Sequence, residues 1–130
     1  MQQRILIVDD DRSTLFALRE YFTSRDFAVD CAQDVQEAKA LLAANHYLVF
    51  ITDLRLTGMD DTQGLDLVTY ARDQSPTIHT ILLTGHWSPQ IEMEARRSGV
   101  DVLLQKPKPL REVEQIVCDL LKSRKEPGQG

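Results

Sequence analysis

The stretch that decides the fold is Ile5–Asp11, ILIVDDD, close to the start of the chain. Four consecutive apolar residues, most of them β-branched, are followed directly by three aspartates. Unbroken apolarity of this kind, without alternating polar residues, is typical of a strand buried on both faces of a parallel sheet. The pattern therefore predicts a central strand over Ile5–Val8 that ends where Asp9, Asp10 and Asp11 begin.

The same pattern, a short apolar run that ends at a polar residue, recurs along the chain. A weaker apolar run, Phe27–Val29, lies between the first strong run and the second. Together these runs predict five strands. The further strong runs and their polar ends are Tyr47–Ile51 with Thr52-Asp53, Thr77–Leu83 with Thr84-Gly85, and Val100–Leu104 with Gln105-Lys106.

The segments between the predicted strands have apolar residues at the three- and four-residue spacing of a helix face. Asp11 or Ser13 is positioned to cap the first helix, Ser88-Pro89 opens the fourth, and Gly99 ends it. Five strands alternating with five helices predict a doubly wound (βα)5 α/β fold, a three-layer sandwich around a five-stranded parallel sheet. The apolar faces include Leu15, Phe16, Leu18 and Phe22 in the first helix and Ile91, Met93 and Ala95 in the fourth.

Composition narrows the class of protein. The chain has 130 residues and a formal net charge of −5, which suits one domain and argues against direct binding to nucleic acid. Cys31 and Cys118 have no zinc or redox spacing, so buried free thiols are expected. With neither a signal peptide nor a membrane-spanning run, we expect a cytoplasmic domain over 1–122 and a disordered tail or linker stub over 123–130.

The polar residues that end the strands suggest a site. In a parallel sheet the carboxyl ends of the strands meet at one edge, which would gather Asp9, Asp10, Asp53, Thr84 and Lys106. Grouped carboxylates repel one another without a cation, and their oxygens suit Mg²⁺. A neighbouring lysine and hydroxyl suit a phosphoryl group, and one carboxylate could act as nucleophile to give an aspartyl phosphate.

Each of these residues also has an ordinary explanation when it is taken alone. An aspartate at a strand–helix junction is often a helix cap, Thr84 can be a turn residue before Gly85, and Lys106 can be a solvated surface lysine. Their joint occurrence at the ends of four different strands favours a functional site.

Four blocks of the sequence resemble the signature blocks of the response-regulator receiver domain of two-component signalling, the CheY-like family. They are Val8–Asp11, Thr52–Leu56, Leu82–His86 and Gln105–Pro107, and they occur in the family's order and separation. The resemblance spans about residues 4–121. It implies a flavodoxin-like sheet with strand order 2-1-3-4-5 and a Mg²⁺-dependent phospho-acceptor switch that catalyses only its own phosphorylation and dephosphorylation.

The resemblance also implies a role for each acidic position. Asp53 would accept the phosphoryl group and coordinate Mg²⁺. Asp10 would be a direct metal ligand, Asp9 would act directly or through water, and the backbone carbonyl of Arg55 would complete the protein's share. Asp11 would belong mainly to the start of the first helix.

The remaining roles follow from the later blocks. Lys106 would contact the phosphoryl oxygens, the Lys106–Pro107 peptide would be cis, and Thr84 would move toward the phosphoryl group as a switch. Family members usually have an aromatic residue at the position of Leu103. We therefore expect the Thr84 shift to pass through backbone or helix repacking instead of an aromatic rotation.

Two further departures lie beside the expected site. The loop Thr57–Gly64 is about three residues longer than usual in the family and could alter access or partner choice, although a tolerated insertion is the simpler explanation. Arg55 and His86 flank Asp53 and Thr84, and we expect them to tune the lifetime of the phosphoryl group.

The resemblance implies a sensor histidine kinase or a histidine phosphotransfer protein as phosphodonor. It also implies an output domain or partner bound through the fourth and fifth helices, within Ser88–Ser98 and Pro109–Lys122, and a homodimer is possible. Neither a membrane nor nucleic acid is an expected direct partner.

Other classes of function fit the sequence less well. In a haloacid-dehalogenase-like phosphatase, Asp9 would be the nucleophile and Asp11 the acid–base residue, but no later acidic metal-binding pair follows Lys106. A flavin-binding module would need a hydroxyl- and glycine-rich phosphate loop after the first strand, where three aspartates stand. A pseudo-receiver that acts only as an interaction module would not need a complete acceptor site.

Overall fold

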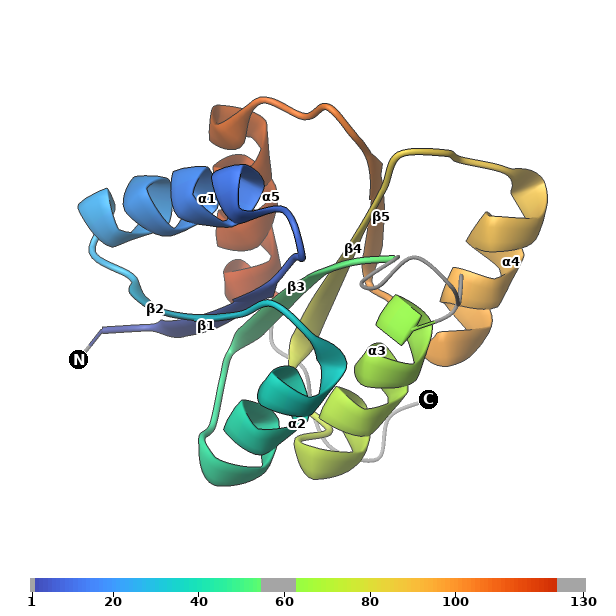
Figure 1. Cartoon of the computed structure of the whole chain (residues 1–130), viewed down its shortest axis with the longest axis horizontal. Helices are drawn as coiled ribbons and strands as arrows, with labels where there is room; N and C mark the ends of the chain where they lie inside the picture. The colour runs from blue at the N-terminus through green and yellow to red at the C-terminus, as the bar shows by residue number, and fades with distance from the viewer. Residues whose placement is uncertain (1, 55–62, 124–130) are drawn as a thin grey trace.

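The structure, a computed structural model, describes residues 2–54 and 63–123. Within these ranges strands and helices alternate along the chain, as the sequence predicts (Figure 1). Tail residues 124–130 and most of the loop 57–64 lie outside the described residues. The elements are β1 (Arg4–Val8), α1 (Arg12–Ser24), β2 (Ala28–Ala32), α2 (Val35–Ala44), β3 (Val49–Asp53), α3 (Gln63–Gln74), β4 (His79–Thr84), α4 (Pro89–Ser98), β5 (Val102–Gln105) and α5 (Leu110–Lys122).

The strands form one parallel sheet in the order β2-β1-β3-β4-β5, which confirms the predicted architecture and strand order. Val8 pairs with both Ala32 and Thr52, and Asp53 pairs with Leu83. This register brings the carboxyl ends of the central strands to the same edge of the sheet. The residues that follow β1 therefore lie beside the end of β3.

Side chains of each strand alternate between the two faces of the sheet. In β1, Ile5 and Ile7 face α1 and α5, whereas Leu6 and Val8 face α2 and α3, and α4 covers the same face beside α3 (Figure 1). Both faces are buried, which explains why the central strands have unbroken apolar runs. The helices complete the core with Leu15, Leu18, Phe22, Val113 and Val117 on the first face and Ala38, Leu42, Leu67, Val68, Ala71 and Ala95 on the second.

Helix ends follow the local chemistry of the sequence. Asp11, not Ser13, caps α1, because its carboxylate accepts a hydrogen bond from the Ser13 backbone N–H. Ser88 caps α4 by accepting from the Ile91 N–H, and Gly99 ends that helix in the left-handed conformation at φ 89°. The Asp11 and Ser88 caps fix the starts of α1 and α4 at the functional edge, whereas Gly99 ends α4 at the opposite edge, before β5.

The predicted strand boundaries are displaced by up to three residues. The strands are Arg4–Val8, not 5–8; Ala28–Ala32, not 27–29; Val49–Asp53, not 47–51; His79–Thr84, not 77–83; and Val102–Gln105, not 100–104. Apolar runs indicate burial, whereas strand boundaries depend on backbone pairing. Tyr47 is buried outside the ladder, and the two polar residues that end β3 still pair with β4.

Two residues that the helical spacing assigned to apolar faces are exposed. Phe16 is 64% exposed and Met93 is 52% exposed. In α1 the stripe formed by Leu15, Leu18 and Phe22 already faces the sheet, and Phe16 lies beside that stripe. Within the described residues, no helix has the length and apolar character that a membrane span requires.

Candidate functional site

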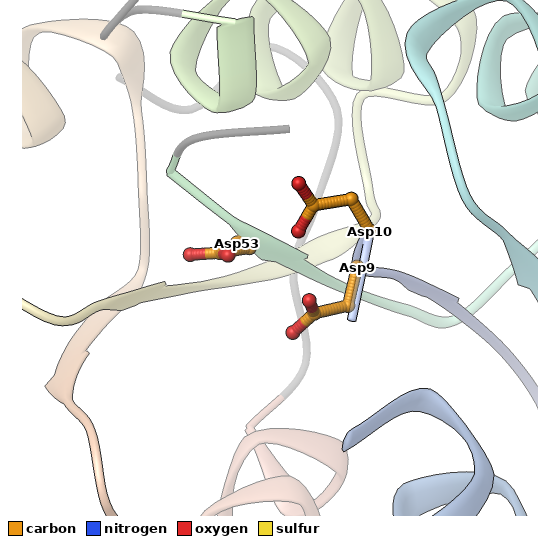
Figure 2. Close-up of side chains that lie close together, drawn as sticks. All are labelled: Asp9, Asp10 and Asp53. Carbon is orange, nitrogen blue, oxygen red and sulfur yellow. The ribbon is translucent and has the colours of Figure 1, made fainter. Parts of the chain in front are cut away.

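Three carboxylates meet at the carboxyl edge of the sheet. Asp9 and Asp10 directly follow β1, and Asp53 is the last residue of β3, as Figure 2 shows. One carboxylate oxygen from each residue lies within 4.8 Å of the others. Hard oxygen donors at this spacing fit a small divalent cation such as Mg²⁺, so the donor chemistry agrees with the expected cofactor.

Asp9 is almost fully buried, at 1% exposure, and its carboxylate is satisfied by two donors. Its Oδ1 accepts the backbone N–H of Asp11 at 2.9 Å, and its Oδ2 accepts the Lys106 ammonium at 2.9 Å. Asp10 is exposed and Asp53 is partly buried. The three carboxylates therefore differ in exposure: Asp9 is buried and paired, Asp53 is partly buried, and Asp10 faces solvent.

Lys106 joins two of the strand ends. Its Nζ lies 2.9 Å from Asp9 Oδ2 and 3.3 Å from Asp53 Oδ2. Burial alone would lower the pKa of Lys106, but the hydrogen bond and charge of Asp9, together with Asp53, outweigh burial and raise the pKa. Lys106 therefore stays charged between the two carboxylates.

Asp53 has the opposite balance. Burial raises the pKa of its carboxyl group, the charge of Asp9 raises it further, and Lys106 only partly offsets these effects. The ionised form of Asp53 is thus disfavoured in the folded state, and the positive charge of a bound cation would offset this effect. Chemically, this favours a nucleophilic carboxylate that works together with a metal ion.

Thr84 ends β4 and is buried, with a hydroxyl group that is already engaged. Its Oγ1 donates to the His86 carbonyl at 3.1 Å and accepts the His86 backbone N–H at 3.1 Å. The hydroxyl therefore closes the turn at the start of the β4–α4 connection. Any contact between this hydroxyl and a ligand at Asp53 would require the turn to open.

A pocket of about 220 Å³ opens beside the carboxylates. This volume is several times the roughly 30 Å³ that one liquid water molecule takes, so a phosphoryl group with bound water fits. Asp53 lines the pocket, whereas Asp9 does not. The lining residues are Asp53, Leu54, Thr84, Gly85, His86, Ile91 and Lys106.

The structure thus brings together Asp9, Asp10, Asp53, Thr84 and Lys106. The peptide bond between Lys106 and Pro107 is cis. Leu103 lies apart from the acidic cluster. It lies on β5, where it pairs with Leu82 of β4, and it packs half-buried against the apolar cluster beneath α4. The exposed His86 lines the pocket, and Arg55 lies outside the described residues.

Sequence reasoning missed one neighbour of Asp53. Gly64, in the first turn of α3, packs against the backbone of Asp53 and Leu54. Two signals in the sequence marked this glycine: it stands at the expected start of a helix, where glycine weakens helix formation, and it aligns with the second glycine of the family's loop.

Comparisons with known proteins agree with this geometry. A family model described as "Response regulator receiver domain" matches residues 5–118. The photosynthetic apparatus regulatory protein RegA of Cereibacter sphaeroides is 34% identical over 84% of this chain. This chain spans only 58% of RegA's length, so the similarity concerns one part of RegA and not the whole protein.

Solved structures support the same assignment. A CheY-like receiver domain protein from Methanospirillum hungatei is 25% identical and superposes with a TM-score of 0.84 over 94% of this chain and 96% of that one. A response regulator from Burkholderia pseudomallei, solved with a phosphorylated aspartic acid, calcium ion and citrate, is 25% identical with a TM-score of 0.79 over 94% of this chain and 75% of that one. The chain therefore belongs to the response regulator receiver domain family of two-component systems.

Proposed function

We propose that Asp53 is the phosphoryl acceptor, supplied by a phosphohistidine on a sensor histidine kinase or a histidine phosphotransfer protein. The observation that supports this most is that Asp53 alone among the three clustered aspartates lines the pocket while it also contacts Lys106. Asp9 is buried and paired, so it is less available as a nucleophile. This argues against the dehalogenase-like alternative.

The transfer is a displacement at phosphorus. An Asp53 oxygen forms the new P–O bond, the P–N bond to the donor histidine breaks, and the imidazole leaves with the bonding electron pair and takes up a proton. Lys106 balances the negative charge of the incoming phosphoryl oxygens, and the sheet edge holds donor and acceptor in line. In dephosphorylation, water attacks phosphorus and returns Asp53 as a carboxylate.

Mg²⁺ is part of this proposal. Asp9, Asp10 and Asp53 would hold the ion, Asp9 directly or through water, together with the backbone carbonyl of Arg55. When bound, it supplies positive charge against the carboxylates and the phosphoryl oxygens. Asp9 keeps Lys106 in position by its buried ion pair, and Asp10 remains accessible to the ion from solvent.

Thr84 reports the phosphoryl group in this proposal. Its hydroxyl would leave the His86 carbonyl and donate to a phosphoryl oxygen, so the turn after β4 would open. Leu103 has no aromatic ring to rotate, so the change would pass through the β4–α4 backbone and the packing of α4. Phosphorylation would then shift a pre-existing equilibrium between two arrangements.

Partners and location belong to the same proposal. The output domain or partner would use α4 and α5, and a homodimer could form through those helices. The two described cysteines are free and half-buried, which agrees with a reducing compartment such as the cytoplasm. The B. pseudomallei relative's phosphorylated aspartate and bound calcium ion support an acceptor site that works beside a divalent cation.

The test compares Asp53→Asn with Asp9→Asn in the presence of Mg²⁺ and a small phosphodonor such as acetyl phosphate. We expect Asp53→Asn to remove phosphoryl incorporation completely, whereas Asp9→Asn slows it by weakening the metal site. Incorporation that survives in Asp53→Asn but disappears in Asp9→Asn would instead favour the dehalogenase-like mechanism. No incorporation in the unaltered protein at saturating Mg²⁺ would favour a pseudo-receiver.

A further inference from the structure

The first turn of α3 closes against the backbone that carries Asp53. The Gly64 N–H donates to the Leu54 carbonyl at 2.9 Å, and the Leu54 N–H donates to the Leu83 carbonyl at 2.8 Å. A hydrogen bond therefore joins Gly64, at the start of α3, to Leu54, the residue that directly follows β3. This neck, formed by Leu54 and Gly64, lies directly after the acceptor position.

Gly64 has no room for a side chain. A Cβ atom there would lie 2.8 Å from Leu54 Cα and 3.0 Å from the Leu54 carbonyl oxygen, and closer still to the Asp53 carbonyl oxygen. All three obstacles are backbone atoms, so no side-chain rotation could relieve the overlap. A Cβ at Gly85, also beside the pocket, would meet nothing within 4 Å. Of these two glycines only Gly64 is closely packed, and at Gly99, which ends α4, the nearest atoms belong to the Arg72 side chain and not to backbone.

We propose that Gly64 is a positioning residue for the acceptor site. Because it lacks a side chain, α3 can pack directly on the Asp53–Leu54 peptide and fix where the Asp53 carboxylate stands relative to Asp9 and Lys106. This inference rests on the proposed function of Asp53. Both metal coordination and in-line transfer depend on such placement, since a displacement of about 1 Å can cost ~10²-fold in rate.

Thermodynamic linkage gives the proposal a second consequence. If the closed neck favours the arrangement of carboxylates that binds Mg²⁺, then Mg²⁺ must stabilise the closed neck by the same factor. The hydrogen bond from the Gly64 N–H reports neck closure directly, because the amide hydrogen can exchange with solvent only when that bond opens. For a helix residue with a purely structural role, exchange would slow only as much as in the rest of α3, through the general stabilisation that ligand binding gives the folded state.

The first experiment compares Gly64→Ala with the matched control Ala71→Gly. Ala71 is buried in the middle of α3 and far from Asp53 in that helix, so its loss weakens α3 without touching the acceptor backbone. Mg²⁺ affinity is measured by titration of amide chemical shifts, and phosphorylation is measured with acetyl phosphate. We expect Gly64→Ala to weaken Mg²⁺ binding by roughly 10–100-fold, as loss of an outer-shell support does.

In the Ala71→Gly control, Mg²⁺ affinity and phosphorylation rate should stay near those of the unaltered protein. This should hold even if Ala71→Gly lowers the stability against urea as much as Gly64→Ala does. The proposal is overturned if Gly64→Ala folds and binds Mg²⁺ as tightly as Ala71→Gly. If the unaltered protein binds Mg²⁺ but takes no phosphoryl group, the proposed function fails, while the effect of Gly64 on Mg²⁺ affinity still tests its positioning role.

The second experiment needs no variant and covers the case in which Gly64→Ala does not fold. Hydrogen exchange of the Gly64 amide is measured in the unaltered protein without Mg²⁺ and at saturating Mg²⁺. We expect exchange to slow when Mg²⁺ binds, and to slow more than exchange of mid-α3 amides such as that of Ala71. Equal exchange of the Gly64 amide in both conditions, or slowing no greater than that of the Ala71 amide, would overturn the proposal.

Discussion

At the scale of single residues, the site is an arrangement of charge around one lysine. The Lys106 ammonium contacts Asp9 and Asp53, and the Asp10 carboxylate stands beside them. One positive charge thus faces three negative ones. Burial raises the pKa of Asp53, and the charge of Asp9 raises it further, in spite of Lys106. The fold therefore bears an electrostatic cost that function requires.

Replacing the acceptor carboxylate should stabilise the fold. In the absence of Mg²⁺ at pH 7, we expect Asp53→Asn to raise the free energy of unfolding by on the order of 1 kcal/mol, since only part of the repulsion is offset by Lys106. Urea denaturation measures the difference. Saturating Mg²⁺ should stabilise the unaltered protein more than the variant and so reduce or reverse the gap.

The pH dependence has a definite sign. The folded-state pKa of Asp53 is raised above its unfolded value, so its contribution to stability is full below the unfolded pKa and is lost as pH rises through the folded pKa. Asp53→Asn should remove this loss and flatten the profile in that window. A variant with the same pH profile as the unaltered protein would contradict this electrostatic account.

His86, which lines the pocket, and Arg55, which follows Asp53 by two residues in the sequence, should set the lifetime of the phosphoryl group. We expect His86→Ala and Arg55→Ala to change the rate of dephosphorylation several-fold without preventing phosphorylation, because these positions flank Thr84 and Asp53. Decay of the labelled protein after removal of the phosphodonor measures the rate. His46→Ala, an exposed histidine of the α2–β3 connection, is the matched control and should have no effect. Unchanged decay in both the His86 and the Arg55 variant would refute the tuning role.

At the scale of elements, each strand end delivers a residue to the edge, and neighbouring helices fix its position. Most of this was predictable, because unbroken apolar runs followed by Asp9, Asp53, Thr84 or Lys106 mark both the buried strand and its end. The sequence could not place Gly64 against Asp53, since that contact depends on how α3 packs across the sheet edge. Nor could periodicity place Phe16 in solvent.

The long connection between β3 and α3 should be tolerant of length. A hydrogen bond joins Leu54 and Gly64 at its two ends, so a change in the number of residues between them need not move the backbone of Asp53. We expect deletion of residues 60–62 to change the free energy of unfolding by only a few tenths of a kcal/mol through loop entropy. The phosphorylation rate should be preserved. A fall in rate as large as that expected for Gly64→Ala would show that the inserted residues act on the site.

The switch should also work without an aromatic rotation. Structures of the protein with and without a phosphoryl mimic such as beryllofluoride should differ in the Thr84–His86 hydrogen bonds and in the backbone before α4. Leu103 should keep its packing beneath α4 or move with that helix. A large rotation of an aromatic side chain near β5 would count against transmission by backbone and helix repacking.

At the scale of the whole molecule, the carboxyl ends of the strands meet at one edge and leave one carboxylate of the acidic cluster, that of Asp53, at the pocket. The helices on both faces bury the sheet, so the chemistry is confined to the carboxyl ends of the strands (Figure 1). The grouping of the site residues follows from this topology. The central claim is that this topology makes Asp53 the residue that is phosphorylated.

The most direct measurement maps the phosphoryl group in the unaltered protein. The protein is incubated with acetyl phosphate and Mg²⁺, the acyl phosphate is reduced with borohydride, and the modified aspartate is located by tandem mass spectrometry. The account predicts modification at Asp53, dependent on Mg²⁺. Modification at Asp9 or Asp10, or none at any aspartate under saturating Mg²⁺ and phosphodonor, would contradict it.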